Sequence, residues 1–225
     1  MKKKLFMCIA VFGLFTATAS AQITDAHQFA NFKRYASSNQ EVSLAPSSEH
    51  LVVFMGNSIT EGWTRIRPDF FKSHGYVGRG ISGQTSYQYL LRFRQDVVAL
   101  SPKAVVINAG TNDIAENTGA YNEDYTFGNI CSMVEIAKAN RIKVILTTTL
   151  PSNHFKWRPQ ISDIPSKITS LNKRVEAYAK AHKIPFVDYY SHMVRPEDGA
   201  LNPDYSNDGV HPTATGYEVM ENLIL

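Results

Sequence analysis

The sequence predicts a single α/β domain in which helices cover both faces of a parallel sheet. Four apolar, β-branched runs and a weaker fifth at residues 76–78 lack the alternation of a half-exposed strand, so both faces of each strand should be buried. Segments with apolar residues at helical spacing separate these runs, and such alternation is typical of a three-layer α/β/α domain. The expected strands cover residues 51–55, 76–78, 104–108, 144–148 and 185–188.

Helical spacing of apolar residues predicts the helices. Three stripes are expected to pack in the core: Leu90, Leu91, Val97 and Val98; Phe127, Ile130, Val134 and Ala137; and Ile168, Leu171, Val175, Tyr178 and Ala179. A last helix should begin near Pro212, where Thr215 and Glu218 have the spacing of a capping box. The polar segment 25–41 predicts one short helix packed on the outside.

The first 21 residues are typical of a secretory signal peptide. A basic start precedes a mostly apolar run, and Ala19-Ser20-Ala21 fits the small-x-small pattern of a cleavage site. We therefore expect cleavage after Ala21 and a secreted or periplasmic protein. The apolar run is too short for a comfortable membrane span, so no stable membrane insertion is expected. The chain then divides into a signal peptide (1–21), an N-terminal extension (22–50) and one main domain (51–225).

Charge and cysteine content narrow the class of protein. Removing Lys2, Lys3 and Lys4 from the 23 basic residues leaves 20, which equals the 20 acidic residues. No basic surface is expected, and hence no nucleic acid partner. Cys131 is the one cysteine left after cleavage, so no intramolecular disulfide can form.

Glycines and small polar residues follow each expected strand. The carboxyl ends of parallel strands meet at one edge of a sheet, and ligands of open α/β sheets bind there. The segments in question are 56–58, 79–85, 108–113, 147–151 and 208–212. They predict a site at this edge.

The residues in these segments supply the parts of an acyl-transfer site. Such a site needs a nucleophile, a base, a group that orients the base, and donors for the developing oxyanion. Ser58 opens a strand-to-helix turn, and His211 with Asp208 three residues earlier offers a base and its partner. Gly83 offers an unobstructed backbone N–H, and Asn112 offers a side-chain amide. Taken alone, Ser58 could equally cap a helix or bind a phosphate.

Four segments together resemble the sequence blocks of the GDSL-type hydrolases of the SGNH superfamily. In family order they are Gly56-Asn57-Ser58-Ile59-Thr60, Gly80-Ile81-Ser82-Gly83-Gln84-Thr85, Gly110-Thr111-Asn112-Asp113 and Asp208-Gly209-Val210-His211-Pro212. They span nearly all of the main domain, so the match is specific. One departure is Asn57, where the family usually has aspartate.

The resemblance implies a flavodoxin-like fold, with a five-stranded parallel sheet of order 2-1-3-4-5, and a serine esterase that needs no cofactor. By position, Ser58, Asp208 and His211 would form the catalytic triad. The Ser58 N–H, the Gly83 N–H and the Asn112 amide would form the oxyanion hole. Residues 51–225 would be the SGNH hydrolase domain.

Other residues near the expected site receive smaller roles. Trp63 follows the serine turn, and a long loop after the fourth strand carries His154, Trp157 and Arg158, so these four are candidates for substrate contact. Asp113 is expected to hold loops together, and Gly80 to serve a turn. The remaining histidines lack ligand spacing, so no metal site is expected.

These observations favour an exported esterase that removes a small acyl group, acetyl above all, from a carbohydrate or a related ester. The alternatives are a lysophospholipase or thioesterase, a non-catalytic glycan-binding module, and a flavin or phosphate binder that uses residues 56–60. A glycan-binding module would not need a complete triad. A flavin or phosphate binder would leave the Asp208 and His211 pair unexplained.

Overall fold

The structure is a computed structural model that describes residues 25–46 and 51–225. The expected signal peptide, residues 1–21, lies outside the described residues. Within the described ranges, none of the helices is both long enough and apolar enough to cross a membrane.

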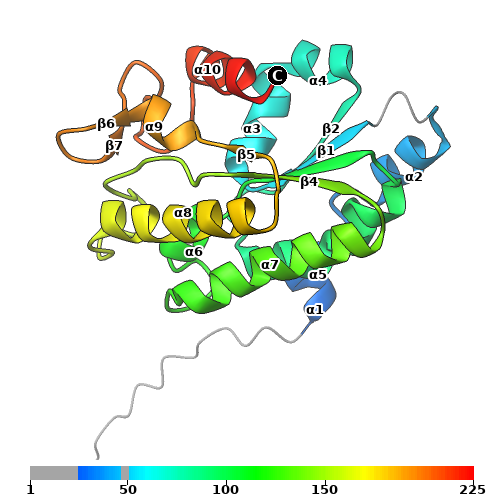
Figure 1. Ribbon diagram of the computed structural model, residues 1–225, viewed down its shortest axis with the longest axis horizontal. Coiled ribbons are helices and arrows are strands. Elements are labelled where there is room, and N and C mark those ends of the chain that lie inside the picture. The colour runs from blue at the N-terminus through cyan, green and yellow to red at the C-terminus, as the bar shows by residue number, and fades with distance from the viewer. Residues whose placement is uncertain (1–24, 47–50) are drawn as a thin grey trace, which may run out of the picture.

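A five-stranded, all-parallel sheet forms the centre of the molecule (Figure 1). The strands are β1 (Val52–Gly56), β2 (Tyr76–Gly80), β3 (Ala104–Ile107), β4 (Lys143–Thr147) and β5 (Phe186–Val187). Their order is β2-β1-β3-β4-β5, which confirms the predicted order. Because β1 lies between β2 and β3, the order reverses at the end of β1, where a ligand site is expected.

Helices cover both faces of the sheet and make three layers (Figure 1). One face carries α3 (Ser58–Ile66), α4 (Pro68–His74), α9 (Tyr189–Met193) and α10 (Ala214–Ile224). The other carries α1 (Ala26–Ala30), α5 (Ser86–Asp96), α6 (Thr111–Ile114), α7 (Glu123–Ala139) and α8 (Ile164–Ala181). The helix α2 (Ala36–Leu44), a 3-10 turn (Val98–Leu100) and a hairpin of β6 (Val194–Arg195) and β7 (Ala200–Leu201) complete the described elements.

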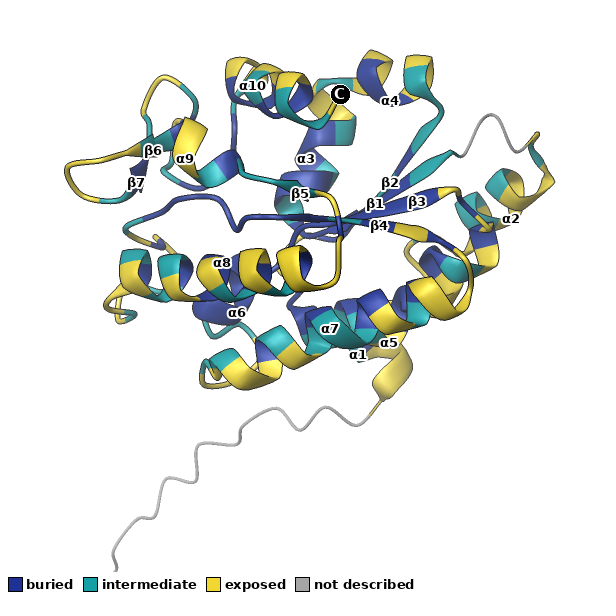
Figure 2. Cartoon of the chain, in the orientation of Figure 1, coloured by how far each residue is buried: buried dark blue, intermediate teal, exposed yellow. Residues whose placement is uncertain are grey.

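Two apolar clusters hold the layers together, one on each face of the sheet. The larger joins the sheet to α5, α7 and α8, and the smaller joins it to α3, α4, α9 and α10. As a consequence, each of the longer helices turns its buried side to the sheet and its exposed side to solvent (Figure 2). The stripes predicted for α7 and α8 lie in the larger cluster or pack against it.

Three details of the helices differ from the predictions. Leu91 is 45% exposed, because α5 turns Tyr89 and Phe93 inward instead. The last helix begins at Ala214, and its N-cap is Thr213, whose hydroxyl accepts from the Gly216 N–H, so the predicted capping box is wrong. The outer N-terminal segment forms two helices, because Asn31 adopts a left-handed conformation that ends α1.

A buried arginine connects the core to the edge where the site is expected. The Arg92 side chain on α5 is fully buried, and its guanidinium donates to Gln84 Oε1 (2.6 Å), Asp96 Oδ2 (2.8 Å) and the Gly56 carbonyl (3.0 Å). Gly56 ends β1, and Gln84 lies in the loop after β2. Arg92 therefore fixes two loops that border the predicted site.

We expect Arg92→Met to lower the free energy of unfolding by about 3–5 kcal/mol, because Asp96 would stay buried without its guanidinium partner. Arg94→Met on the same helix is the control, since Arg94 is exposed, and it should change this free energy by less than about 0.5 kcal/mol. Urea denaturation of the two variants checks this. Equal stability of both variants would show that the buried contacts of Arg92 are not stabilising.

Candidate active site

A tight turn from β1 into α3 presents the candidate nucleophile. Ser58 is the first residue of α3, and the preceding Asn57 caps the helix by accepting from the Ile59 N–H at 2.9 Å. Asparagine therefore does here the capping work that an aspartate would do. Gly56 allows the sharp turn, because a Cβ at this position would lie 2.0 Å from Thr60 Oγ1. The Ser58 N–H belongs to the first turn of α3, where backbone donors are free of intrahelical partners.

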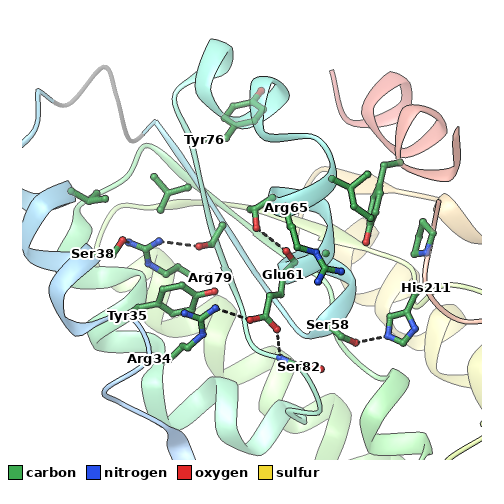
Figure 3. Close-up of a pocket in the computed structure, with 18 of the residues that line it drawn as sticks. Arg34, Tyr35, Ser38, Ser58, Glu61, Arg65, Tyr76, Arg79, Ser82 and His211 are labelled. Atoms are coloured by element: carbon green, nitrogen blue, oxygen red, sulfur yellow. Dashed lines mark hydrogen bonds and ion pairs between the residues drawn. The ribbon is translucent and has the colours of Figure 1, made fainter. Parts of the chain in front are cut away.

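The three predicted triad residues form one continuous chain of hydrogen bonds. Ser58 Oγ lies 2.9 Å from His211 Nε2 (Figure 3), and His211 Nδ1 lies 2.7 Å from Asp208 Oδ2. With the Nδ1 proton directed to Asp208, Nε2 can accept the serine proton. Ser58 and His211 are 153 residues apart in the sequence, and the fold brings them together.

The turn at residues 206–212 fixes the carboxylate as well as the imidazole. Asp208 Oδ1 accepts from the N–H groups of Val210 (2.9 Å) and His211 (2.8 Å), and Gly209 adopts a positive φ of 79°. Partial burial acts to raise the pKa of Asp208, but the backbone N–H and the imidazole of His211 outweigh it and lower the pKa to about 2. The carboxylate is therefore ionised at any pH where a histidine acts as a base.

Two residues that could supply further hydrogen-bond donors line the same pocket, one from the loop after β2 and one from α6. Gly83 lies in the loop after β2 with a φ of 77°, and nothing lies within 4 Å of where a side chain would begin. Asn112 on α6 is buried, and its Nδ2 donates to the Gln84 carbonyl at 2.9 Å. An amide nitrogen carries two hydrogens, so one holds the side chain in place and the other is free to bind an oxyanion.

Asp113 and Gly80 have structural roles. The buried Asp113 carboxylate accepts from the Ser86 N–H and hydroxyl at the start of α5 and from Thr126 on α7, and burial raises its pKa. The predicted structural role of Asp113 therefore fits, although it joins the helices α5, α6 and α7 and not loops. Gly80 ends β2 against α3, where a Cβ would lie 2.4 Å from the Glu61 N–H nitrogen, so close packing rather than a turn requires glycine.

A small pocket of about 250 Å³ collects these groups. It is lined by Ser58, Ser82, Gly83, Asn112, Asn117, Trp157 and His211. Trp157 is 42% exposed, and its Nε1 donates to Asn117 Oδ1 at 3.0 Å. Asn117 Nδ2 in turn donates to the Gly83 carbonyl at 3.0 Å. The indole is thereby fastened across the pocket to the loop that carries Gly83.

Of the four candidates for substrate contact, only Trp157 lines the pocket. Trp63 is 2% exposed and stacks between Phe70 and Tyr217, so its prediction is wrong. His154 is exposed and lies behind the turn of Asp208, with its ring against Gly209. Arg158 is half-buried and also lies outside the pocket lining.

Two residues with contacts at or beside the pocket, Asn117 and Glu61, were not predicted from the sequence. Asn117 lies in a polar stretch that reads as an ordinary turn, and nothing in its neighbours marks the contact to Trp157. Glu61 on α3 accepts from the Ser82 N–H at 2.9 Å and from Arg34 of the N-terminal segment at 2.8 Å (Figure 3). Its spacing of three residues from Ser58 on a helix was the available signal.

Comparisons with known proteins identify relatives of this chain. A GDSL-like lipase of Bacteroides thetaiotaomicron VPI-5482 has a solved structure that is 68% identical, covers 87% of this chain and 96% of its own, and superposes with a TM-score of 0.85. An uncharacterized lipoprotein of Bacillus subtilis (strain 168) is 27% identical over 66% of this chain and 74% of its own length.

A third relative carries the name of an activity. An acetylxylan esterase of Xylanibacter ruminicola is 22% identical over 80% of this chain. The chain spans only 43% of the length of that protein. The model of the GDSL-like lipase/acylhydrolase family matches residues 54–219, which include every residue of the candidate triad and of the candidate oxyanion hole. With its parallel sheet in the order 2-1-3-4-5, the chain therefore belongs to the GDSL-like lipase/acylhydrolase family.

Proposed function

We propose that the protein is a serine esterase that removes a small acyl group, acetyl above all, from a carbohydrate. The unbroken chain from Ser58 Oγ through His211 to Asp208 supports this proposal more than any other observation. Neither a glycan-binding module nor a phosphate binder would require a serine hydroxyl aligned with a paired imidazole.

In the proposed mechanism, Ser58 Oγ attacks the ester carbonyl carbon while His211 Nε2 takes the hydroxyl proton. Asp208 stabilises the imidazolium that forms. The N–H groups of Ser58 and Gly83 and the Asn112 amide bind the oxyanion. Collapse of the tetrahedral intermediate breaks the bond to the alcohol, which leaves with the proton from His211. Water, deprotonated by His211, then cleaves the acyl-enzyme and releases the acid.

The dimensions of the pocket support a short acyl group. The space between Ser58 and Trp157 is about 250 Å³, and most of the residues that line it are polar. A long acyl chain of a lysophospholipid or thioester would need an apolar channel instead. The acetylxylan esterase among the relatives supports acetyl on a plant polysaccharide.

Hydrolysis of p-nitrophenyl esters of two, four and eight carbons, together with release of acetate from acetylated xylo-oligosaccharides, tests the proposed function. We expect kcat/KM to be highest for the acetate ester and free acetate to appear from the oligosaccharides. A preference for the eight-carbon ester would favour the lysophospholipase alternative, and no turnover of any ester would refute the esterase. We also propose that residues 1–21 direct export, which N-terminal sequencing of the mature protein tests.

We expect Trp157→Ala to raise the ratio of kcat/KM for the eight-carbon ester to that for the acetate ester by about tenfold, because the indole no longer closes the pocket. Lys156→Ala is the matched control, since the neighbouring Lys156 is exposed and does not line the pocket. The p-nitrophenyl ester series measures both variants. An unchanged ratio in Trp157→Ala would mean that another wall limits the acyl chain.

We expect Asn112→Ala to lower kcat by roughly 10²–10³-fold with little change in KM, because a single oxyanion donor acts mainly in the transition state. Initial rates on p-nitrophenyl acetate measure the effect. Thermal unfolding of the variant is the control, since Asn112 also donates to the Gln84 carbonyl. A correctly folded Asn112→Ala enzyme with undiminished kcat would contradict the assignment of this donor.

A further inference from the structure

A second, larger depression adjoins the candidate nucleophile. It encloses about 1050 Å³ and shares Ser58, Ser82 and His211 with the small pocket. It runs from these residues along one side of α3 towards β2 and the N-terminal helices (Figure 3). Gly83 and Asn112, the candidate oxyanion donors, line the small pocket and not this groove.

Each of the two spaces suits one half of an ester. The acyl group and the alcohol diverge from the carbonyl carbon, which must lie at Ser58 Oγ with its oxygen towards the oxyanion donors. The small pocket, which holds those donors and ends at Trp157, suits the acyl side. The alcohol then extends into the larger groove, where His211 can protonate the leaving oxygen. A volume of about 1050 Å³ leaves room for an alcohol much larger than one sugar residue.

The wall of this groove includes a part of the chain outside the family domain. The groove is lined by Arg34 and Tyr35 from the turn between α1 and α2 and by Ser38 and Val42 from α2, whereas the family model begins at residue 54. The Tyr35 ring lies between the guanidinium groups of Arg34 (5.0 Å) and Arg79 (4.7 Å), and its hydroxyl donates to the Gly80 carbonyl. The N-terminal wall is therefore attached to the carboxyl end of β2.

The charges that line the groove are mostly satisfied, with one exception. Glu61 pairs with Arg34, and Asp208 pairs with His211. The buried Arg79 donates to Asn39, Ser38 and the Gly78 carbonyl. Arg65 is exposed, and across residues 25–46 and 51–225 no carboxylate lies within 4.0 Å of its guanidinium.

Arg65 is also well placed with respect to the reacting serine. It follows Ser58 by seven residues on α3, which puts it on the same face about 10 Å further along the helix. Figure 3 shows its side chain beside the groove between Glu61 and His211. This rise along the helix axis is comparable to the length of one or two sugar residues of an acylated chain. Arginine pairs with carboxylate or phosphate through two parallel hydrogen bonds.

We propose that this groove binds the alcohol part of the ester, and that Arg65 recognises an anionic group, a carboxylate or a phosphate, that this alcohol carries. The proposal rests on the proposed esterase function. It names a substrate class, an acylated acidic saccharide or polyol phosphate, that the family membership does not specify.

Three substrates distinguish the source of the anion: a neutral acetylated xylo-oligosaccharide, the same oligosaccharide with a glucuronic acid branch, and 1-acetylglycerol 3-phosphate. We expect the wild-type enzyme to have a higher kcat/KM on one of the two anionic substrates than on the neutral one. Arg65→Gln should lower the ratio of anionic to neutral kcat/KM by about tenfold, as the loss of one charge-assisted hydrogen bond predicts. Arg94→Gln, an exposed arginine on α5 outside the groove, should leave this ratio unchanged.

Binding provides a readout that does not depend on turnover. Calorimetric titration of the wild-type protein with the deacetylated acidic oligosaccharide and with glycerol 3-phosphate should show binding of one of them, and Arg65→Gln should weaken it about tenfold. Equal hydrolysis of the neutral and both anionic substrates, with no effect of Arg65→Gln on the ratio, would overturn the anionic subsite while leaving the esterase intact. Loss of all ester hydrolysis, including p-nitrophenyl acetate, would instead refute the proposed function.

Discussion

Replacing Ser58 by alanine is expected to lower kcat on p-nitrophenyl acetate by at least about 10⁴-fold, because Ser58 Oγ is the hydroxyl hydrogen-bonded to His211 Nε2 and the proposed acyl-enzyme forms on it. The substitution removes Oγ alone, so His211 and the proposed oxyanion donors should stay in place. The residual rate is measured at high enzyme concentration and corrected for uncatalysed hydrolysis. It reports how far those donors accelerate attack by water alone. Rapid mixing of wild-type enzyme should also show a burst of p-nitrophenol if deacylation is slower than acylation.

Ser82→Ala is the matched control for this experiment. Ser82 lines both the small pocket and the groove, and its backbone N–H donates to Glu61 at 2.9 Å, whereas its hydroxyl makes no hydrogen bond within residues 25–46 and 51–225. Removal of this hydroxyl should change kcat by less than about twofold. If Ser58→Ala kept most of the activity while Ser82→Ala lost it, the nucleophile would have to be reassigned.

The fold was predictable because strand burial leaves a strong mark on sequence. All five expected strands exist, with ends that differ by at most two residues at either side. The helix α5 was the weakest point. Adjacent Leu90 and Leu91 do not reveal which one faces the core, and Arg92 with Asp96 reads as an exposed pair four residues apart on a helix. Both charged side chains are in fact buried, because Arg92 also binds Gln84 and the Gly56 carbonyl.

The same reasoning explains the different outcomes at α3. Successive helical residues are about 100° apart, so Trp63, five residues after Ser58, points about 140° away from it. Arg65, seven residues after Ser58, points within about 20° of it. Helical geometry alone therefore separates the core tryptophan from the groove arginine. The burial of Trp63 makes its prediction as a substrate contact wrong.

Contacts between distant segments could not be predicted. Nothing in the N-terminal segment indicates that Gln84 donates to the Ala30 carbonyl or that Gln88 donates to the Phe29 carbonyl. These bonds bring α1 against the loop that carries Gly83 and against the start of α5. Such pairings depend on how the chain returns over the completed sheet, and the short polar helices involved have no distinctive pattern of their own.

Replacing Asp208 by asparagine is expected to lower kcat by about 10⁴-fold while leaving KM for p-nitrophenyl acetate nearly unchanged. An amide can donate to Nδ1, which would leave the proton on Nε2 and prevent His211 from accepting the proton of Ser58. The imidazolium would also lose its counter-charge at 2.7 Å. A variant that retained more than a tenth of wild-type kcat would show that Asp208 does not orient the base.

Stability measured against pH distinguishes this catalytic effect from simple damage to the turn. The pKa of Asp208 is about 2 in the folded protein, below its ordinary value of 3.8. A depressed pKa of this kind stabilises the fold above about pH 4, and the contribution is lost as the pH falls towards 2.

Asp208→Asn should therefore unfold at a lower urea concentration than the wild type at pH 7, and the difference should shrink between pH 4 and pH 2. The activities of the two proteins are compared at pH 7. A stability difference that stayed constant down to pH 2 would mean that the hydrogen bonds from the backbone to Asp208, and not the charge of Asp208, stabilise the fold. The loss of kcat would then be the only evidence that the charge of Asp208 acts in the reaction.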